Sequence, residues 1–210
     1  QSTAEHSVVL LAAPSHRLTE IDFHGHSDLD LVPLGEIEYP PVASVSLGFK
    51  RLDVEHPLDG FGMLVPEKED RDVLGTLFCS SLFPNRAPEG HVLLTSYVGG
   101  SRAPALTELS REGLADLVWW DLHEMLGITG PPTFQHVTIF PKAIAQYNIG
   151  FGAYREHMNA LEKSEPGIFL AGHYRDGISL SDSIVSGRKA GDRILESLKT
   201  AVDKQLELAH

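Results

Sequence analysis

The sequence predicts an α+β fold in which a mixed, largely antiparallel sheet is covered on one side by helices. Two local patterns support this class. Residues 43–49 (ASVSLGF) alternate small polar and apolar side chains, as a half-buried strand does. Residues 110–126 place apolar side chains at helical spacing, and Ser110 can cap the start of this helix while Gly127 can end it.

The remaining elements are predicted from similar signals in chain order. Residues 8–13 (VVLLAA) are an apolar strand that stops at Pro14, and residues 16–23 form a short helix that packs Leu18 and Ile21. Residues 24–36, rich in Asp, Gly, Ser and His, are predicted as a loop. Further predicted strands are 74–80, 92–98, 134–140 and 167–171, and further predicted helices are 154–163 and 182–198.

The segment 167–187 (GIFLAGHYRDGISLSDSIVSG) carries the clearest functional signal. An apolar strand meets Gly172, whose backbone can take angles closed to other residues, and a short loop runs through Gly177 into a helix. Ser179, Ser181 and Asp182 are good N-cap residues. Such a turn gathers free backbone N–H groups at the positive end of a helix, which suits an anion or an electron-rich cofactor ring. Turns of this geometry also occur in α/β proteins that bind no cofactor.

Composition limits the classes of function. The 210 residues allow one domain or two small ones, and a hydrophobic content of 42% is enough for a core. The net charge of −12 argues against a nucleic-acid partner and against electrostatic attachment to anionic lipid. A single cysteine, Cys79, excludes a disulfide framework within the chain, and no apolar run approaches the roughly 20 residues that span a bilayer. Because no signal peptide is visible either, we expect a cytoplasmic protein.

Neither a metal site nor a catalytic side chain is predicted. The pair His24 and His26 has no third ligand at a useful spacing, and the sequence holds no H-E-x-x-H or C-x-x-C motif. Ser80 and Ser81 lack the G-x-S-x-G pattern of a hydrolase nucleophile.

The residues of the glycine segment are more specific than its geometry. The pattern A-G-x-Y-x-x-G-[IV]-[SA]-[VL]-x-D-x-I-x-S-G, from Ala171 to Gly187, resembles the C-terminal flavin-binding segment of the protoporphyrinogen and coproporphyrinogen III oxidase family, which is amine-oxidase-like. Further segments match the family's motifs in order and extend the resemblance over residues 8–198: Tyr39–Ala43, the turn Gly60–Pro66 (GFGMLVP), Ser80–Pro88 (SSLFPNRAP), Gly99-Gly100, Leu126–Ile128 and Ala143–Tyr147.

The resemblance implies an FAD-dependent, oxygen-using oxidase of haem biosynthesis that converts protoporphyrinogen IX or coproporphyrinogen III to the porphyrin. It places flavin contacts at Val9, Gly172, Gly177, Ile178, Ser179 and Leu180, and substrate contacts at Val98 and Gly99. The backbone N–H groups of residues 178–180 would stabilise the charge that gathers on the reduced ring, so no catalytic side chain is required. The candidate partners for the substrate carboxylates, none of them singled out, are Arg86, Arg102, Lys142 and Arg155.

The resemblance also divides the chain into parts. Residues 1–30 would supply a strand and a helix of the FAD-binding domain, 31–160 the substrate-binding domain, 161–200 the C-terminal FAD-binding segment and 201–210 a tail. The sequence lacks the G-x-G-x-x-G motif that grips the pyrophosphate of a dinucleotide. We therefore expect a C-terminal fragment that holds no FAD and shows no oxidase activity without the missing N-terminal flavin-binding part of the same protein. Peripheral membrane association of the complete enzyme stays open.

Several positions depart from the family's pattern, among them Gly150-Phe151-Gly152, where some members have Gly-His-Trp. The family often has Asn or a small residue at the position of His173, Cys at that of Ser183 and Pro at that of Ala145. Two other functions stay open. Another amine-oxidase-like flavoprotein, such as a carotenoid desaturase or an amine oxidase, would share a looser form of the last segment but not GFGMLVP or FPNRAP. The second alternative is a non-catalytic binding domain, and only the matched motifs argue against it.

Overall fold

The computed structural model describes residues 4–24 and 29–208, and His26 lies outside them. The chain folds into two compact units, which we call the terminal unit (residues 1–38 and 144–210) and the central unit (residues 39–143). The predicted assignment of residues 1–30, 31–160 and 161–200 to flavin and substrate parts stays a prediction, because compactness does not say which ligand a unit holds.

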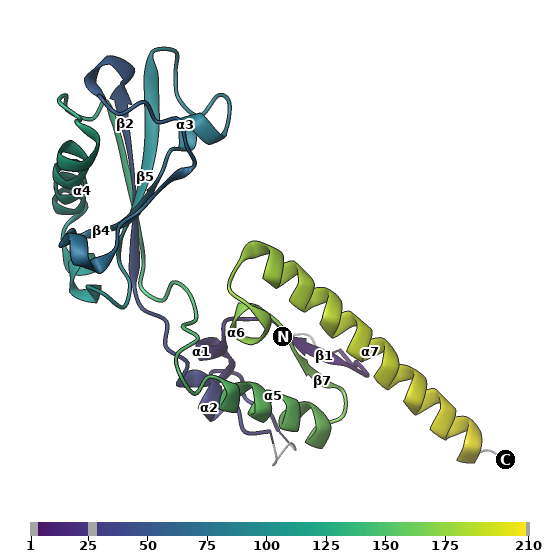
Figure 1. Ribbon diagram of the computed structural model, residues 1–210. Coiled ribbons are helices and arrows are strands. Elements are labelled where there is room, and N and C mark those ends of the chain that lie inside the picture. The colour runs from purple at the N-terminus through teal and green to yellow at the C-terminus, as the bar shows by residue number, and fades with distance from the viewer. Residues whose placement is uncertain (1–3, 25–28, 209–210) are drawn as a thin grey trace. The chain divides into compact units, whose positions relative to one another are not determined.

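The central unit is built on a five-stranded antiparallel sheet in the order β3-β4-β5-β2-β6 (Figure 1). Strand β2 pairs with β5, with Val42 opposite Gly99 and Lys50 opposite His91, and with β6 on its other side. Along β2, alternate side chains are buried from Ala43 to Leu47, as the sequence pattern predicts. The five strands are β2 (Val42–Lys50), β3 (Gly62–Leu64), β4 (Val73–Leu77), β5 (His91–Gly99) and β6 (Phe134–Phe140).

Helix α4 (Arg111–Leu126) covers one face of this sheet, as predicted (Figure 1). The side chain of Ser110 accepts the N–H of Gly113 at 3.0 Å, and Gly127 ends the helix with a φ of +61°. Burial of each large apolar side chain contributes on the order of 2 kcal/mol, so this face anchors the helix. The side chains buried on it include Leu114, Val118 and Leu122, which are fully buried.

One buried carboxylate of α4 also fixes the start of β4. Oδ2 of Asp121 accepts the N–H groups of Asp72 and Val73 at 3.0 Å each. Arg71 lies 3.7 Å from the other oxygen of the same carboxylate. Desolvation, followed by the charge of Asp121, raises the pKa of Asp72 above its ordinary value.

Four local predictions are wrong. The strand predicted over residues 74–80 ends at Leu77, and Cys79 and Ser80 begin helix α3 (Cys79–Leu82) instead. Gly62–Leu64, predicted within a turn, forms the edge strand β3 by pairing with β4. Helix α1 is limited to Ser15–Leu18, so Ile21 is 43% exposed instead of packed. The predicted loop 24–36 contains helix α2 (Val32–Gly35), which buries Leu34. The remaining short elements are η1 (Arg51–Asp53), η2 (Glu67–Glu69) and η3 (Pro104–Glu108).

The terminal unit contains a separate, parallel pair of strands, β1 (Val9–Leu11) and β7 (Ile168–Leu170). Val9 lies opposite Ile168, and Leu11 lies opposite Leu170. This pairing confirms the prediction that the two segments lie together outside the main sheet. Around the pair lie α5 (Gly152–Ser164), α6 (His173–Asp176) and α7 (Leu180–Leu208), the last of which extends beyond both predicted ends, 182 and 198 (Figure 1).

Candidate functional site

The candidate site is the glycine turn that joins β7 to α7. Gly172 and Gly177 have φ values of +133° and +131°, which L side chains rarely adopt. A Cβ on Gly172 would lie 3.1 Å from the Tyr174 ring, and one on Gly177 would lie 2.6 Å from Cγ of Asp182. The backbone angle therefore favours glycine at both positions, and at Gly177 the space also excludes a side chain. Between the two glycines, α6 makes a single helical turn.

The start of α7 is closed by a reciprocal cap. Oγ of Ser179 accepts the N–H of Asp182 at 3.0 Å, while Oδ2 of Asp182 accepts the N–H of Ser179 at 3.1 Å and its hydroxyl at 2.7 Å. This is a capping box with Ser179 as the N-cap. Its hydrogen bonds, led by the one from the Ser179 hydroxyl, lower the pKa of the exposed Asp182 carboxyl.

A pocket of about 280 Å³ opens beside this turn, at the carboxyl ends of β1 and β7. Open α/β sheets bind ligands beyond these strand ends. Ser183 and Gly187, one helical turn apart on α7, form one wall, and a Cβ added to Gly187 would meet nothing within 4 Å. Burial lowers the pKa of His173, which favours its neutral imidazole. The residues around the pocket are Leu10, Ala12, Ala13, Pro14, Ala171, Gly172, His173, Tyr174, Ser183 and Gly187.

A buried serine on α7 holds the inner side of the turn. Oγ of Ser186 accepts the N–H of Gly172 at 2.9 Å and donates to Oδ2 of Asp176 at 2.5 Å. Lys189, one turn further along α7, lies 3.8 Å from the other oxygen of Asp176. The two ends of α6 are thus tied to the same helix.

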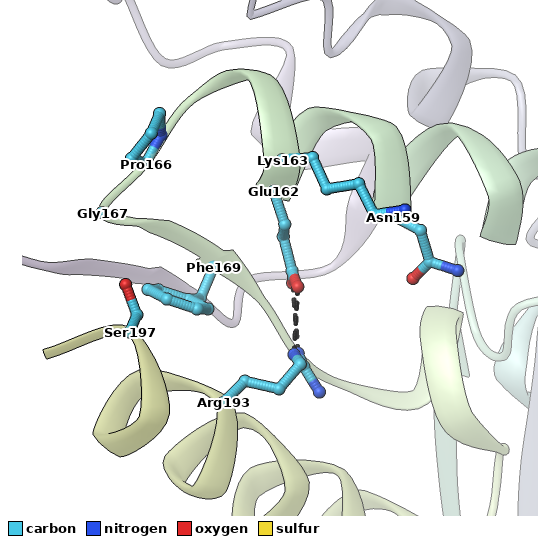
Figure 2. Close-up of a pocket in the computed structure, with 8 residues that line it drawn as sticks. All are labelled: Asn159, Glu162, Lys163, Pro166, Gly167, Phe169, Arg193 and Ser197. Carbon is cyan, nitrogen blue, oxygen red and sulfur yellow. Dashed lines mark hydrogen bonds and ion pairs between the residues drawn. The ribbon is translucent and has the colours of Figure 1, made fainter. Parts of the chain in front are cut away.

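A partly buried ion-pair network fixes α7 against β7 and α5 (Figure 2). Arg193 donates to both carboxylate oxygens of Glu162, at 3.0 and 3.1 Å, and also to the carbonyl of Leu170 at 2.8 Å. Oε1 of Glu162 further accepts the N–H of Leu170 at 2.8 Å, and Arg175 lies 3.3 Å away. The network borders a second pocket, of about 370 Å³, whose other lining residues are Asn159, Lys163, Pro166, Gly167, Phe169 and Ser197 (Figure 2).

The structure places the predicted flavin residues in the terminal unit, but only Gly172 lines the 280 Å³ pocket. Val9 is a neighbour of the pocket residue Leu10 in β1. Ile178 and Leu180 are exposed, and their N–H groups have no partner among the described residues. The N–H of Ser179 is taken up by Asp182 and is not free, in contrast to the sequence-based expectation of three free groups.

The predicted substrate residues lie in the central unit. Val98 is fully buried in the core of the sheet, opposite Ala43. Gly99 has a φ of +100°, and a Cβ there would come within 2.6 Å of Thr107. Among the candidate cations, Arg102 donates to the carbonyl of Val65 at 2.8 Å. Contact of Val98 and Gly99 with substrate stays a prediction.

Three parts of the site were not predicted from the sequence. Ser186 and Tyr147 stand inside matched motifs, but nothing in the sequence says what they bind. The spacing of Ser183 and Gly187 by one helical turn is a signal that could have identified the pocket wall. Glu162 and Arg193 carry no local signal at all.

Among residues 4–24 and 29–208, no group of three or more His, Cys, Asp or Glu side chains could hold a metal ion. No helix in the same residues has the length and apolar character to cross a bilayer.

Comparison with known proteins places the chain in a family. The family model described as flavin containing amine oxidoreductase matches residues 2–195. A mitochondrial protoporphyrinogen oxidase of Nicotiana tabacum is 39% identical over 82% of this chain and 34% of its own length, and protoporphyrinogen oxidase 2 of Arabidopsis thaliana is 35% identical over 93% and 39%. A coproporphyrinogen III oxidase of Bacillus subtilis is 29% identical over 71% of this chain and 32% of its own length.

Solved structures share the fold. A crystal structure from Exiguobacterium sp. 255-15, provisionally assigned as a protoporphyrinogen oxidase, has a TM-score of 0.74 at 24% identity and covers 90% of this chain and 41% of its own. Reduced UDP-galactopyranose mutase has a TM-score of 0.72 at 16% identity and covers 92% and 42%. The chain spans between 34% and 39% of the first two curated relatives, so it corresponds to part of their length. The match to the family model and the identity to these relatives show that the chain belongs to the flavin-containing amine oxidoreductases.

Proposed function

We propose that the chain contributes the substrate-binding part and the last flavin-binding segment of an FAD-dependent, oxygen-using porphyrinogen oxidase. The observation that carries the proposal is its identity of 30–39% to six proteins named protoporphyrinogen oxidase, over 70–93% of the chain. Family membership supplies the flavin, and the glycine turn supplies a place for it.

The residues at the turn fit one side of a flavin ring. The pocket is lined largely by apolar and small residues, and Gly187 leaves its wall open. Two N–H groups, those of Ile178 and Leu180, have no partner among the described residues. A volume of about 280 Å³ is small for a complete ligand pocket, so the terminal unit would provide only part of the site. The residues proposed to hold FAD are Val9, Gly172, Gly177, Ile178, Ser179 and Leu180.

When bound, FAD supplies the hydride acceptor that oxidation of a porphyrinogen needs. The chain's own residues would bind and orient. The N–H groups of Ile178 and Leu180 would donate to the electron-rich edge of the ring, where fixed donors are most effective. Asp182, already engaged by Ser179, would serve as a cap and not as a base. Val98 and Gly99 are both buried in the central unit, so their contact with the substrate is proposed from the resemblance alone.

The proposed substrate is a porphyrinogen, because relatives named for protoporphyrinogen and for coproporphyrinogen both match. The test is to measure oxidation of both compounds by the complete protein with FAD, following porphyrin fluorescence and oxygen uptake. Oxidation of either, dependent on FAD, supports the proposal, and the ratio of rates identifies the substrate. FAD binding without oxidation of either would instead indicate another amine-oxidase-like flavoprotein, and failure to bind FAD a non-catalytic domain.

A second flavin-binding part of the same protein belongs to this proposal. The matched relatives are longer, and these 210 residues contain no G-x-G-x-x-G motif to hold a pyrophosphate. The 210 residues purified alone should be colourless and inactive. A stoichiometric flavin absorbance in that sample would overturn this part of the proposal. A cytoplasmic location, with peripheral membrane association of the complete enzyme left open, also remains a proposal, to be tested by fractionation.

A further inference from the structure

A tyrosine outside the glycine segment spans the turn from one end to the other. Oη of Tyr147 donates to the carbonyl of His173 at 2.5 Å and accepts the N–H of Gly177 at 2.8 Å. His173 is the first residue of α6, and Gly177 is the residue at which α6 ends. A single hydroxyl therefore bridges the two ends of this turn, in addition to the hydrogen bond that Ser186 accepts from Gly172.

The ring that carries this hydroxyl is itself held in place. Tyr147 stacks on Phe151, with ring centroids 3.9 Å apart and planes inclined by 17°. Phe151 is buried. On either side of Tyr147, the N–H of Gln146 donates to the carbonyl of Glu38 at 2.9 Å, and the amide of Asn148 donates to the Glu38 carboxylate at 2.8 Å. The loop that carries the Tyr147 hydroxyl is therefore held in place by hydrogen bonds on both sides and by ring stacking.

The contact matters because Gly177 directly precedes the segment whose free N–H groups, those of Ile178 and Leu180, are proposed to meet the flavin. Gly177 has wide backbone freedom, and its N–H has no partner among the described residues other than Tyr147. Without the hydroxyl, the chain just before the flavin-facing amides would sample more conformations. Restricting this segment to one conformation when the flavin binds would then cost free energy and weaken binding.

We propose that Tyr147 is a positioning residue for the flavin site, holding the His173–Gly177 turn in the geometry that binds the ring. This inference rests on the proposed function. It concerns binding and the environment of the cofactor, and it assigns Tyr147 no contact with substrate.

The test compares Tyr147→Phe with Tyr154→Phe in the complete protein. Tyr154 lies in the same unit, touches Phe151, and its hydroxyl has no hydrogen bond among the described residues, so it controls for the loss of one hydroxyl. In Tyr147→Phe we expect the dissociation constant for FAD to rise about tenfold, as two net hydrogen bonds allow. We also expect altered visible circular dichroism of the bound flavin and faster hydrogen exchange at the Gly177 amide without flavin. Tyr154→Phe should change none of these.

The outcomes separate this inference from the proposed function. If the unaltered protein takes up no FAD, the proposed function fails and the flavin role of Tyr147 fails with it. If the unaltered protein binds FAD but Tyr147→Phe matches it in affinity and dichroism, only the present inference fails. Equal losses in both variants would show a general packing effect and would also overturn it. Unchanged exchange at Gly177 would show that the hydroxyl does not hold the turn.

Discussion

Ser179 and Asp182 cap the start of α7 reciprocally: each side chain accepts the backbone N–H of the other, at 3.0 and 3.1 Å, and the serine hydroxyl also donates to the carboxylate at 2.7 Å. The arrangement commits both polar side chains to the helix start. Any contact with the flavin must therefore come from the backbone N–H groups of neighbouring residues. The Asp182 carboxylate has a structural role as part of the cap.

Replacing Ser179 with Ala should destabilise the protein by about 1 kcal/mol, because the helix loses its N-cap acceptor and the Asp182 carboxylate loses the hydroxyl donor. Ser181→Ala is the matched control, since no hydrogen bond of its hydroxyl is found among the described residues. Urea unfolding followed by far-ultraviolet circular dichroism measures both. Equal free energies of unfolding for the two variants would contradict the capping role.

The cap should weaken in acid. The folded-state pKa of Asp182 lies below its ordinary value of 3.8, chiefly because of the hydrogen bond from the Ser179 hydroxyl. A depressed carboxyl pKa adds stability that is complete above the unfolded-state value and is lost as the pH falls through the folded-state value. The unfolding midpoint of the unaltered protein should therefore exceed that of Asp182→Asn at neutral pH and converge with it below pH 3.8. A gap that persists in strong acid would refute this.

Gly177→Val should disrupt the turn more than loss of the cap does. Its φ of +131° is rare for L residues, and a Cβ would lie 2.6 Å from Cγ of Asp182, within the capping box itself. Strain of this kind costs about 1–3 kcal/mol in addition to the displaced cap. Thermal unfolding and FAD retention in the complete protein report both effects. Retention of FAD equal to that of the unaltered protein would show that this turn is not part of the cofactor site.

Gly187→Ala should separate folding from flavin binding. Glycine within a helix costs about 1 kcal/mol relative to alanine, so the variant should be more stable. Yet its new methyl group would enter open space on the wall of the 280 Å³ pocket and should weaken FAD binding. Gly191→Ala is the control: it also meets nothing within 4 Å, lies on the same helix and does not line that pocket. It should stabilise equally and leave FAD affinity unchanged; the same affinity in both variants would argue against the pocket as the flavin site.

Glu162→Gln should cost about 3 kcal/mol or more, because it leaves the guanidinium groups of Arg175 and Arg193 without their buried counter-charge. Glu20→Gln, which breaks an exposed pair with Arg17, should cost well under about 1 kcal/mol. Chemical denaturation of the two variants makes the comparison. A small and equal effect would mean that the network contributes little to holding α7.

Local signals predicted the elements whose ends are marked by their own residues. Helix α4 begins after Ser110 and ends at Gly127 because a capping hydroxyl and a glycine act within a few residues of the helix itself. Residues 134–140 and 43–49 were likewise predicted as strands from the pattern of their own residues, and both are strands in the structure. The pairing of residues 8–13 with 167–171 came instead from the family resemblance, since no local signal links segments so far apart.

The sequence by itself predicted the fold class, the family and the glycine turn with its three candidate cap residues, because each can be recognised from short patterns of neighbouring residues. Only the tertiary structure decided which atoms that turn meets. It made Gly62–Leu64 an edge strand, left Ile21 exposed, and distinguished Gly187, which lines a pocket, from Gly191, which does not. Most of these outcomes depend on contacts between distant segments, whose geometry exists only once the backbone has folded.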